Sequence, residues 1–219
     1  NIACGYHAGN ETTMKQTVAL CKKYNVAVGA HPSFPDHENF GRTDMLLPPT
    51  EIYETVVKQI KKLEKIALAS GVSLHHVKPH GALYNMAARD KSLAPLIALA
   101  VLDTNRQCIL YGLSGSYLIK EGKNHGLKTA NEVSADRTYK DDGTLTSRSK
   151  PDALIEETDK AVAQVLQMIK KGIVTSTSGK KISIVAETIC IHGDGEHAAE
   201  FAKAIHDALM KEGIEIKAR

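Results

Sequence analysis

The chain has 219 residues, of which 42% are hydrophobic and 24% charged, and its formal net charge is +3. This composition is typical of a globular protein long enough to bury a substantial core. Charges of both signs are mixed along the chain without a basic block, which argues against nucleic-acid binding. No apolar stretch approaches the roughly 18 residues of a membrane span.

Short apolar runs alternate with amphipathic stretches along the whole chain. In chain order, helices are expected at 11–24 with Asn10 as N-cap, from Thr50 with Thr50 as cap, and at 91–103, 115–122, 153–171 and 196–211. The helix from Thr50 has the apolar stripe Ile52, Val56, Ile60, Leu63 and Ile66. Strands are expected at 1–4, 26–30, 73–77, 108–112, 127–133, 186–191 and 214–218.

This alternation predicts an α/β fold built from parallel βα units, either a seven-stranded barrel or a doubly wound sheet. The segment 173–184, "IVTSTSGKKISI", is expected to add a small β-hairpin with its turn at Ser178-Gly179. No linker or low-complexity segment interrupts the pattern, so residues 1–219 are expected to form a single domain. The four cysteines are far apart and form no CxxC pair, which predicts reduced thiols and a cytoplasmic location.

Polar side chains follow most of the predicted strands, at the point where each strand ends. They are His7, His31, Lys78, His80, Asp136, Arg137, His192 and Asp194. Carboxyl ends of parallel strands share one rim in a barrel, and that rim is where active sites lie, so these residues are expected to line one site. The histidines and Asp194 are candidates for proton transfer, and Lys78, Asp136 and Arg137 for substrate binding.

Each residue also has a purely structural interpretation. A single histidine such as His7 or His31 is more often a hydrogen-bonded structural residue than a catalyst. Asp194 is equally suited to cap the last helix. Lys78 can extend its amine to solvent, and Arg137 can pair with Asp136 or Asp141. A metal site from these histidines is chemically feasible, but their dispersion leaves the metal unidentified.

Several segments together identify a family resemblance. They are "NIACGYHAGN", "VAVGAHPSFPD", "FGR", "HVKPHGALYN", "EVSADRTY", "RSKPDALI" and "ICIHGDGEHA". In this order they resemble the LamB/YcsF family, described as the A subunit of bacterial 5-oxoprolinase. The resemblance implies a divergent TIM-like (β/α) barrel of the glycoside hydrolase/deacetylase type. Family members normally begin with a strand containing a "DLNCDLGE"-like segment, so the N-terminal strand is expected to be missing from this sequence.

The resemblance also implies an activity. It is the ATP-dependent hydrolysis of the 5-oxoproline lactam to L-glutamate, with Mg expected beside ATP and with 5-oxoprolinase subunits B and C as partners. A homo-oligomer is compatible with the sequence. Two alternatives stay open: a metal-dependent amidohydrolase or polysaccharide deacetylase on the related fold, and a non-catalytic subunit that binds the substrate.

Overall fold

A computed structural model describes residues 1–193, 195 and 197–217 of the chain. Its contacts divide the chain into two compact units, residues 1–130 and 131–219, and the strand β5 crosses the boundary between them. The expectation of a single domain stays a prediction. Among the described residues, no helix is both long and apolar enough to cross a bilayer.

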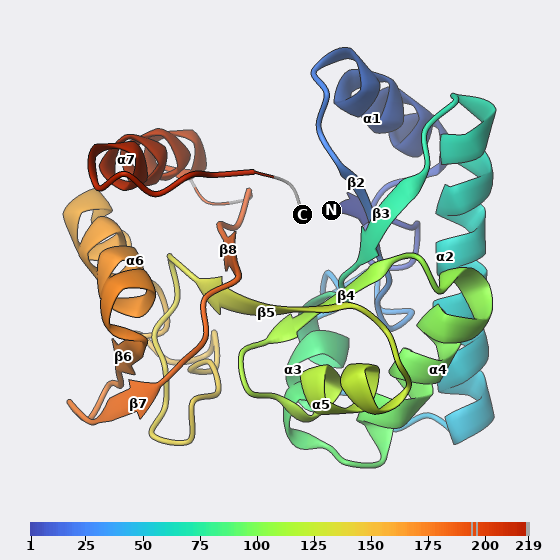
Figure 1. The fold of residues 1–219 in the computed structure, drawn as a ribbon. Helices are drawn as coiled ribbons and strands as arrows, with labels where there is room; N and C mark the ends of the chain where they lie inside the picture. The colour runs from blue at the N-terminus through green and yellow to red at the C-terminus, as the bar shows by residue number, and fades with distance from the viewer. Residues whose placement is uncertain (194, 196, 218–219) are drawn as a thin grey trace. The chain divides into compact units, whose positions relative to one another are not determined.

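The first unit is a run of parallel strands connected by helices (Figure 1). Its elements are β1 (Ile2–Ala3), α1 (Glu11–Lys23), β2 (Val28–His31), α2 (Pro49–Ala69), β3 (Leu74–Val77), α3 (Gly81–Arg89), α4 (Leu93–Asn105), β4 (Ile109–Leu113), α5 (Tyr117–Asn124) and the start of β5 (Thr129–Ser134). The strand order is β1-β2-β3-β4, and each of these pairs is parallel. The predicted α/β class, with parallel βα units, is therefore confirmed.

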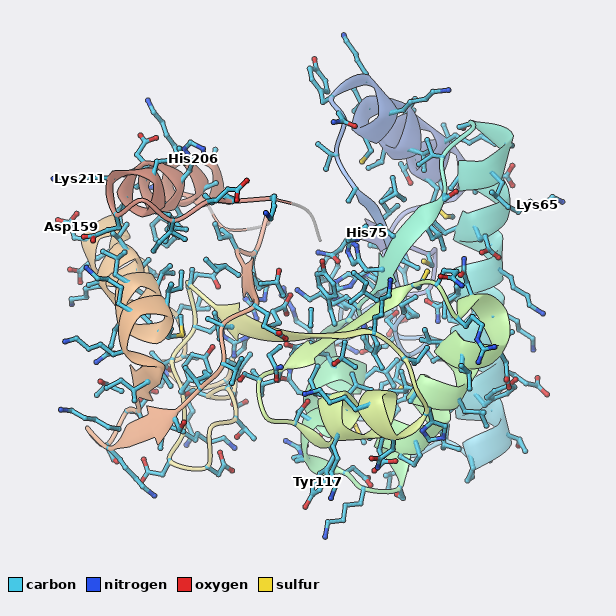
Figure 2. All side chains as sticks on the ribbon, in the orientation of Figure 1. Lys65, His75, Tyr117, Asp159, His206 and Lys211 are labelled. Carbon is cyan, nitrogen blue, oxygen red and sulfur yellow. The ribbon has the colours of Figure 1, made fainter. Side chains whose placement is uncertain are left out.

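Helix α2 provides much of the core of this unit. The predicted stripe of Ile52, Val56, Ile60, Leu63 and Ile66 is buried. The opposite side of the helix is polar, and Figure 2 shows Lys65 projecting outward from it. This burial of one face explains why the sequence forms a long helix here.

Two of the predicted helix caps had different outcomes. Asn10 caps α1 as expected, because its Oδ1 accepts from the Thr13 N–H at 3.0 Å while the Thr13 hydroxyl accepts from the Asn10 N–H at 2.8 Å. The cap assigned to Thr50 is wrong: Pro48 is the N-cap and makes no side-chain cap bond. Pro49 at the first helical position already has the backbone angle a helix needs and has no N–H to satisfy.

Helix α3 was not expected from the sequence. Its residues Ala82, Leu83, Tyr84, Met86, Ala87 and Ala88 are all buried. Because the helix is buried on nearly every side, its sequence lacks the alternation of polar and apolar residues from which a helix is predicted. Its start also lacks a side-chain cap that could have marked it.

The second unit contains the end of β5, α6 (Thr158–Lys171), β6 (Ile173–Thr175), β7 (Lys181–Ser183), β8 (Thr188–Cys190) and α7 (Ala198–Lys211). Strand β5 pairs in parallel with β8, and β6 pairs antiparallel with β7, which confirms the predicted hairpin. Helices α6 and α7 lie side by side (Figure 1) and bury Ala161, Val165, Met168, Phe201, Ile205 and Leu209.

Two boundaries in this unit differ from the predictions. Helix α6 begins at Thr158 rather than at residue 153. The residues before it pair with the backbone of another segment: the Ile155 N–H donates to the Asp136 carbonyl at 2.9 Å, and Leu154 forms an antiparallel β-bridge with Arg137. A strand was expected at 214–218. That prediction is wrong for residues 214–217, which form no strand, and residue 218 lies outside the described residues. The Ile214 N–H donates to the Leu209 carbonyl at 2.9 Å, so this residue closes the end of α7 instead of pairing in a sheet.

Candidate active site

The ends of three neighbouring strands bring three histidine rings together in the first unit. His31 is the last residue of β2, His7 lies on the segment after β1, and His80 lies just beyond β3. The ring centroids of His7 and His80 are 3.9 Å apart with an interplanar angle of 7°, and those of His31 and His80 are 4.8 Å apart. We refer to these three residues as the histidine cluster.

The "KPH" segment after β3 explains how His80 reaches its neighbours. The Lys78 N–H donates to the Ala30 carbonyl at 2.9 Å and the His80 N–H donates to the Pro32 carbonyl at 2.8 Å. Between them stands Pro79, which has no N–H to donate. The extended backbone therefore continues beside β2 past the end of β3, and it carries His80 to His31.

Ser33 determines the tautomer of His7. His7 Nδ1 lies 2.8 Å from the Ser33 hydroxyl oxygen, and the hydroxyl itself donates to the Phe34 carbonyl at 2.9 Å. Since the hydroxyl hydrogen is committed to Phe34, Nδ1 of His7 carries the hydrogen, and Nε2 of the neutral ring keeps a lone pair. Burial, together with the positive charges of His80 and Arg42, lowers the pKa of His7 to about 3. This ring is therefore neutral at physiological pH.

Gln59 of α2 holds Ser33 in place. Its side-chain oxygen accepts from the Ser33 N–H at 3.0 Å, and its amide nitrogen donates to the Ser33 carbonyl at 2.8 Å. The Gln59 side chain is buried among the apolar residues of the α2 stripe. A polar residue on the buried face of a helix was the sequence signal for this role.

Carbonyl oxygens flank the other two histidines. His31 Nδ1 lies 2.6 Å from the Lys78 carbonyl oxygen, and His31 Nε2 lies 3.0 Å from His80 Nδ1. His80 Nε2 lies 2.8 Å from the Phe40 carbonyl oxygen. Burial and the positive charge of Lys78 lower the pKa of His31 well below its ordinary value.

The "FGR" segment has a steric role beside the cluster. Phe40 and Gly41 both have positive φ, +56° and +68°. A Cβ on Gly41 would lie 2.9 Å from the His7 Cβ, and one on Gly81 would lie 2.3 Å from the Gly41 carbonyl oxygen. That carbonyl accepts from the Ala82 N–H at 2.9 Å. Glycine is required at both positions so that the loop can approach His80.

Lys78 is a buried residue, and its ammonium nitrogen lies 5.8 Å from the centroid of the Tyr84 ring. It therefore does not extend into solvent as a rim lysine would. Its role in substrate binding stays a prediction.

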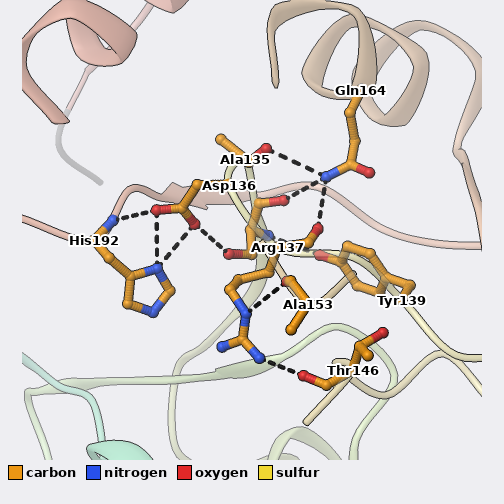
Figure 3. Close-up of polar contacts among 9 residues, drawn as sticks. Ala135, Asp136, Arg137, Tyr139, Thr146, Ala153, Gln164 and His192 are labelled. Atoms are coloured by element: carbon orange, nitrogen blue, oxygen red, sulfur yellow. Dashed lines mark hydrogen bonds and ion pairs between the residues drawn. The ribbon is translucent and has the colours of Figure 1, made fainter. Parts of the chain in front are cut away.

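The second unit contains an aspartate–histidine pair, formed where β5 and β8 end (Figure 3). Asp136 Oδ2 accepts from the His192 backbone N–H at 2.8 Å, and Asp136 Oδ1 lies 2.8 Å from His192 Nδ1. The Ser134 hydroxyl also donates to Oδ1 at 3.0 Å. Burial by itself raises the pKa of Asp136, but the hydrogen bonds from His192 and Ser134 outweigh it and lower the pKa to about 2.

An ionised aspartate at Nδ1 determines which nitrogen of His192 is basic. The Nδ1–H donates to the carboxylate, so the lone pair is on Nε2, as in the histidine of a serine-protease triad. The side chain of His192 is 27% exposed and that of Asp136 is 13% exposed. The pair is thus partly open to solvent and suited to accept a proton from water.

Arg137 and its neighbours hold the loop that carries Asp136. Arg137 Nε donates to the Ala153 carbonyl at 3.2 Å and Nη2 donates to the Thr146 carbonyl (Figure 3). The Gln164 amide lies within 3.3 Å of the carbonyls of Ser134, Ala135 and Arg137. Arg137 is buried and ties this loop together, while its part in substrate binding stays a prediction.

The structure therefore places the predicted residues in two groups. His7, His31 and His80 are in contact in the first unit, beside the Lys78 backbone, and Asp136 contacts His192 in the second. Asp194 lies outside the described residues. That all of them line one rim stays a prediction. Sequence reasoning missed Ser33, Gln59 and the Phe40 carbonyl.

A metal site needs several ligating side chains around one point. Within residues 1–193, 195 and 197–217, no group of three His, Cys, Asp or Glu side chains is arranged to hold a metal ion. The contacts of the histidine cluster include those among its own rings and those to Ser33, to backbone carbonyls and to the Phe40 ring.

Comparison with known proteins gives matches along the whole chain. The model of the LamB/YcsF family matches residues 1–219. A relative from Tolumonas auensis, named as the A subunit of 5-oxoprolinase, is 54% identical over 218 residues, which cover 100% of this chain and 87% of that protein. The protein of the same name from Bacillus subtilis is 53% identical, with 100% and 85% covered. The crystal structure of a lactam utilization protein from Thermus thermophilus superimposes with a TM-score of 0.92 at 40% identity, covering 100% of this chain and 87% of that one. This match supports the predicted TIM-like fold class.

Proposed function

This chain belongs to the LamB/YcsF family, and we propose that it is the A subunit of a 5-oxoprolinase, which hydrolyses the lactam of 5-oxoproline to L-glutamate. The names of the relatives at 51–54% identity along nearly the whole chain support this function. The finer parts of the proposal are ATP dependence, Mg beside ATP, a cytoplasmic location and partnership with subunits B and C.

The chemistry of a lactam defines what the protein must supply. A lactam is a stable amide, so its opening needs a base that activates water and an acid that protonates the ring nitrogen as it leaves. ATP, when bound, supplies the free energy for attack on this unreactive amide. We propose that residues of the partner subunits form part of the ATP-binding site.

The observation that carries the catalytic part of the proposal is the Asp136–His192 pair. The carboxylate orients the imidazole and stabilises the imidazolium that forms when Nε2 takes a proton from water. We assign His192 as the general base on this ground. A base of this kind contributes about 10²–10⁴ in rate.

The remaining polar residues receive roles that follow from their chemistry. The histidine cluster supplies further proton-transfer groups, and Asp194 stays a candidate acid or base. Lys78 and Arg137 are each proposed to bind substrate, and Arg137 would have to exchange one of its bonds to the Ala153 and Thr146 carbonyls to do so.

Reconstitution tests this function directly. The chain is combined with subunits B and C, and glutamate formation from 5-oxoproline is measured with and without ATP. His192→Asn is compared with His206→Asn, because His206 lies on an exposed face of α7 (Figure 2). We expect ATP-dependent turnover that His192→Asn lowers about 10²–10⁴-fold and that His206→Asn leaves unchanged.

Other outcomes point to the alternatives. ATP-independent turnover that a chelator abolishes would indicate a metal-dependent amidohydrolase. If both turnover and substrate binding are unchanged in His192→Asn, His192 is not the general base. That result would favour the alternative in which this chain binds the substrate without catalysing the reaction. No glutamate from the complete set of subunits would contradict the proposed function.

A further inference from the structure

Three short contacts lie in series through His31 and His80. They run from the Lys78 carbonyl to His31 Nδ1 at 2.6 Å, from His31 Nε2 to His80 Nδ1 at 3.0 Å, and from His80 Nε2 to the Phe40 carbonyl at 2.8 Å. Both ends of this series are carbonyl oxygens, which only accept hydrogen bonds.

Counting hydrogens shows what the series requires. Each end contact needs an N–H on a ring, and the contact between the rings needs a third hydrogen. Two neutral imidazoles carry one N–H each and so provide only two. With two hydrogens, one of the three contacts would bring two lone pairs face to face.

We propose that the His31–His80 pair holds one proton more than two neutral rings at neutral pH, so that the pair carries a single positive charge and His80 is the imidazolium. His31 is then neutral, donates Nδ1–H to Lys78, and accepts at Nε2 from His80. His80 donates from both nitrogens, to His31 and to Phe40. Every contact in the series is satisfied by this arrangement.

The location of the charge on His80 follows from the surroundings of the two rings. Burial and the Lys78 ammonium disfavour a charge on His31. His80 is only half-buried, and its ring is stacked on neutral His7. A neutral aromatic face next to a cation is favourable.

Other charged and titratable groups face the cluster and oppose the charge. Arg42 and His37 come from the loop that carries Phe40, and Lys78 comes from the end of β3. The two carbonyls, which accept an N–H at each end of the series, favour the proton against these charges. Phe40 presents its carbonyl through a loop whose shape depends on Gly41, so this loop controls the charge of His80.

The result is a charged proton donor, His80, stacked on the neutral ring of His7, whose Nε2 keeps a lone pair. This inference concerns the charge state of the chain alone and goes beyond the proposed function. It holds whether or not the substrate is 5-oxoproline.

Nuclear magnetic resonance of the ¹⁵N-labelled histidine rings tests the proposal without any substrate. Correlations between ring carbon-bound hydrogens and ring nitrogens distinguish an imidazolium, with two protonated nitrogens, from a neutral ring with one. Spectra of His31→Gln and His80→Gln assign the two residues. At pH 7 we expect His80 as imidazolium and His31 as the neutral Nδ1–H tautomer, with a midpoint for His80 above the ordinary value of about 6.5.

A loop variant with a matched control tests the part of Phe40. Gly41→Ala forces the loop away from His80, whereas Gly126→Ala introduces the same methyl at φ +73° with nothing within 4 Å. Gly41→Ala should lower the His80 midpoint by about one pH unit, the scale expected for losing a hydrogen bond to the charged form, and Gly126→Ala should not change it.

The titration of the unmodified protein decides the matter if Gly41→Ala does not fold. A His80 ring that is neutral at pH 7, with one unprotonated nitrogen and a midpoint at or below about 6.5, would overturn the proposal. An unchanged midpoint in folded Gly41→Ala would overturn the role of the Phe40 carbonyl.

Discussion

Asp136 holds His192 through both of its carboxylate oxygens, one on the backbone N–H at 2.8 Å and the other on Nδ1 at 2.8 Å. The backbone contact fixes the position of the residue, and the ring contact fixes its tautomer. The two residues are 56 positions apart in the chain and meet because β5 and β8 pair in parallel.

Asp136→Asn should reduce turnover strongly while leaving the fold intact. An asparagine amide can donate to Nδ1 and so favours the wrong tautomer, which leaves Nε2 without its lone pair. The expected loss in kcat is about 10²–10⁴-fold. Steady-state kinetics of the reconstituted enzyme measure it, with Asp159→Asn on the exposed side of α6 as control. Equal activity of the two variants would contradict the assignment.

His7 should make the protein sensitive to acid. Its pKa in the folded state is about 3, below the ordinary value of about 6.5. The unfolded state therefore binds the proton first, so the stability that neutral His7 contributes is complete above pH 6.5 and is lost as pH falls toward 3. The slope from this group approaches about 1.4 kcal/mol per pH unit.

The comparison for this prediction is His7→Asn against His206→Asn. An asparagine amide can still donate to Ser33 but does not titrate. Urea unfolding between pH 7 and 4 should show that the stability advantage of the wild type over His7→Asn shrinks as pH falls. His206→Asn should follow the wild-type curve, and a constant difference for His7→Asn would refute the pKa assignment.

Gln59→Leu should destabilise the fold. The substitution leaves the buried N–H and carbonyl of Ser33 without their partners, at about 1–3 kcal/mol for each unsatisfied group. Urea unfolding measures the loss. Gln16→Leu, on an exposed position of α1, is the matched control and should change stability by less than about 0.5 kcal/mol. Similar stabilities for the two variants would show that Gln59 does not support Ser33.

Gly81→Ala should destabilise more than Gly126→Ala. Both positions have positive φ, which costs an alanine about 1–2 kcal/mol. At Gly81 the new Cβ would also lie 2.3 Å from the Gly41 carbonyl oxygen, a backbone atom held by the Ala82 N–H. Overpacking of this kind adds about 1–3 kcal/mol. Thermal unfolding of the two variants gives the difference, and equal melting temperatures would mean that the loop moves freely.

Local patterns in the sequence were sufficient for several parts of the fold. The α2 stripe, the Asn10 cap and the hairpin at 173–184 each depend on residues close together in the chain. The polar residues at strand ends were also visible, because a strand that stops on a lysine or histidine breaks its apolar pattern. Where burial is uniform, as in α3, or where backbone pairing replaces a helix, as at Ile155, the local pattern carried no such information.

The tertiary structure alone decided which atoms meet. Ser33 sets the tautomer of His7 across 26 positions, and Phe40 reaches His80 across 40. The sequence identified His31 and His80 as candidate site residues. It did not show that the Lys78 and Phe40 carbonyls would each accept an N–H from this pair, which is the reason for the extra proton that we propose. The reason is physical: the chemistry of an imidazole depends on the donors and acceptors within about 3 Å of its nitrogens, and those partners are supplied by parallel strands and loops that only folding brings together.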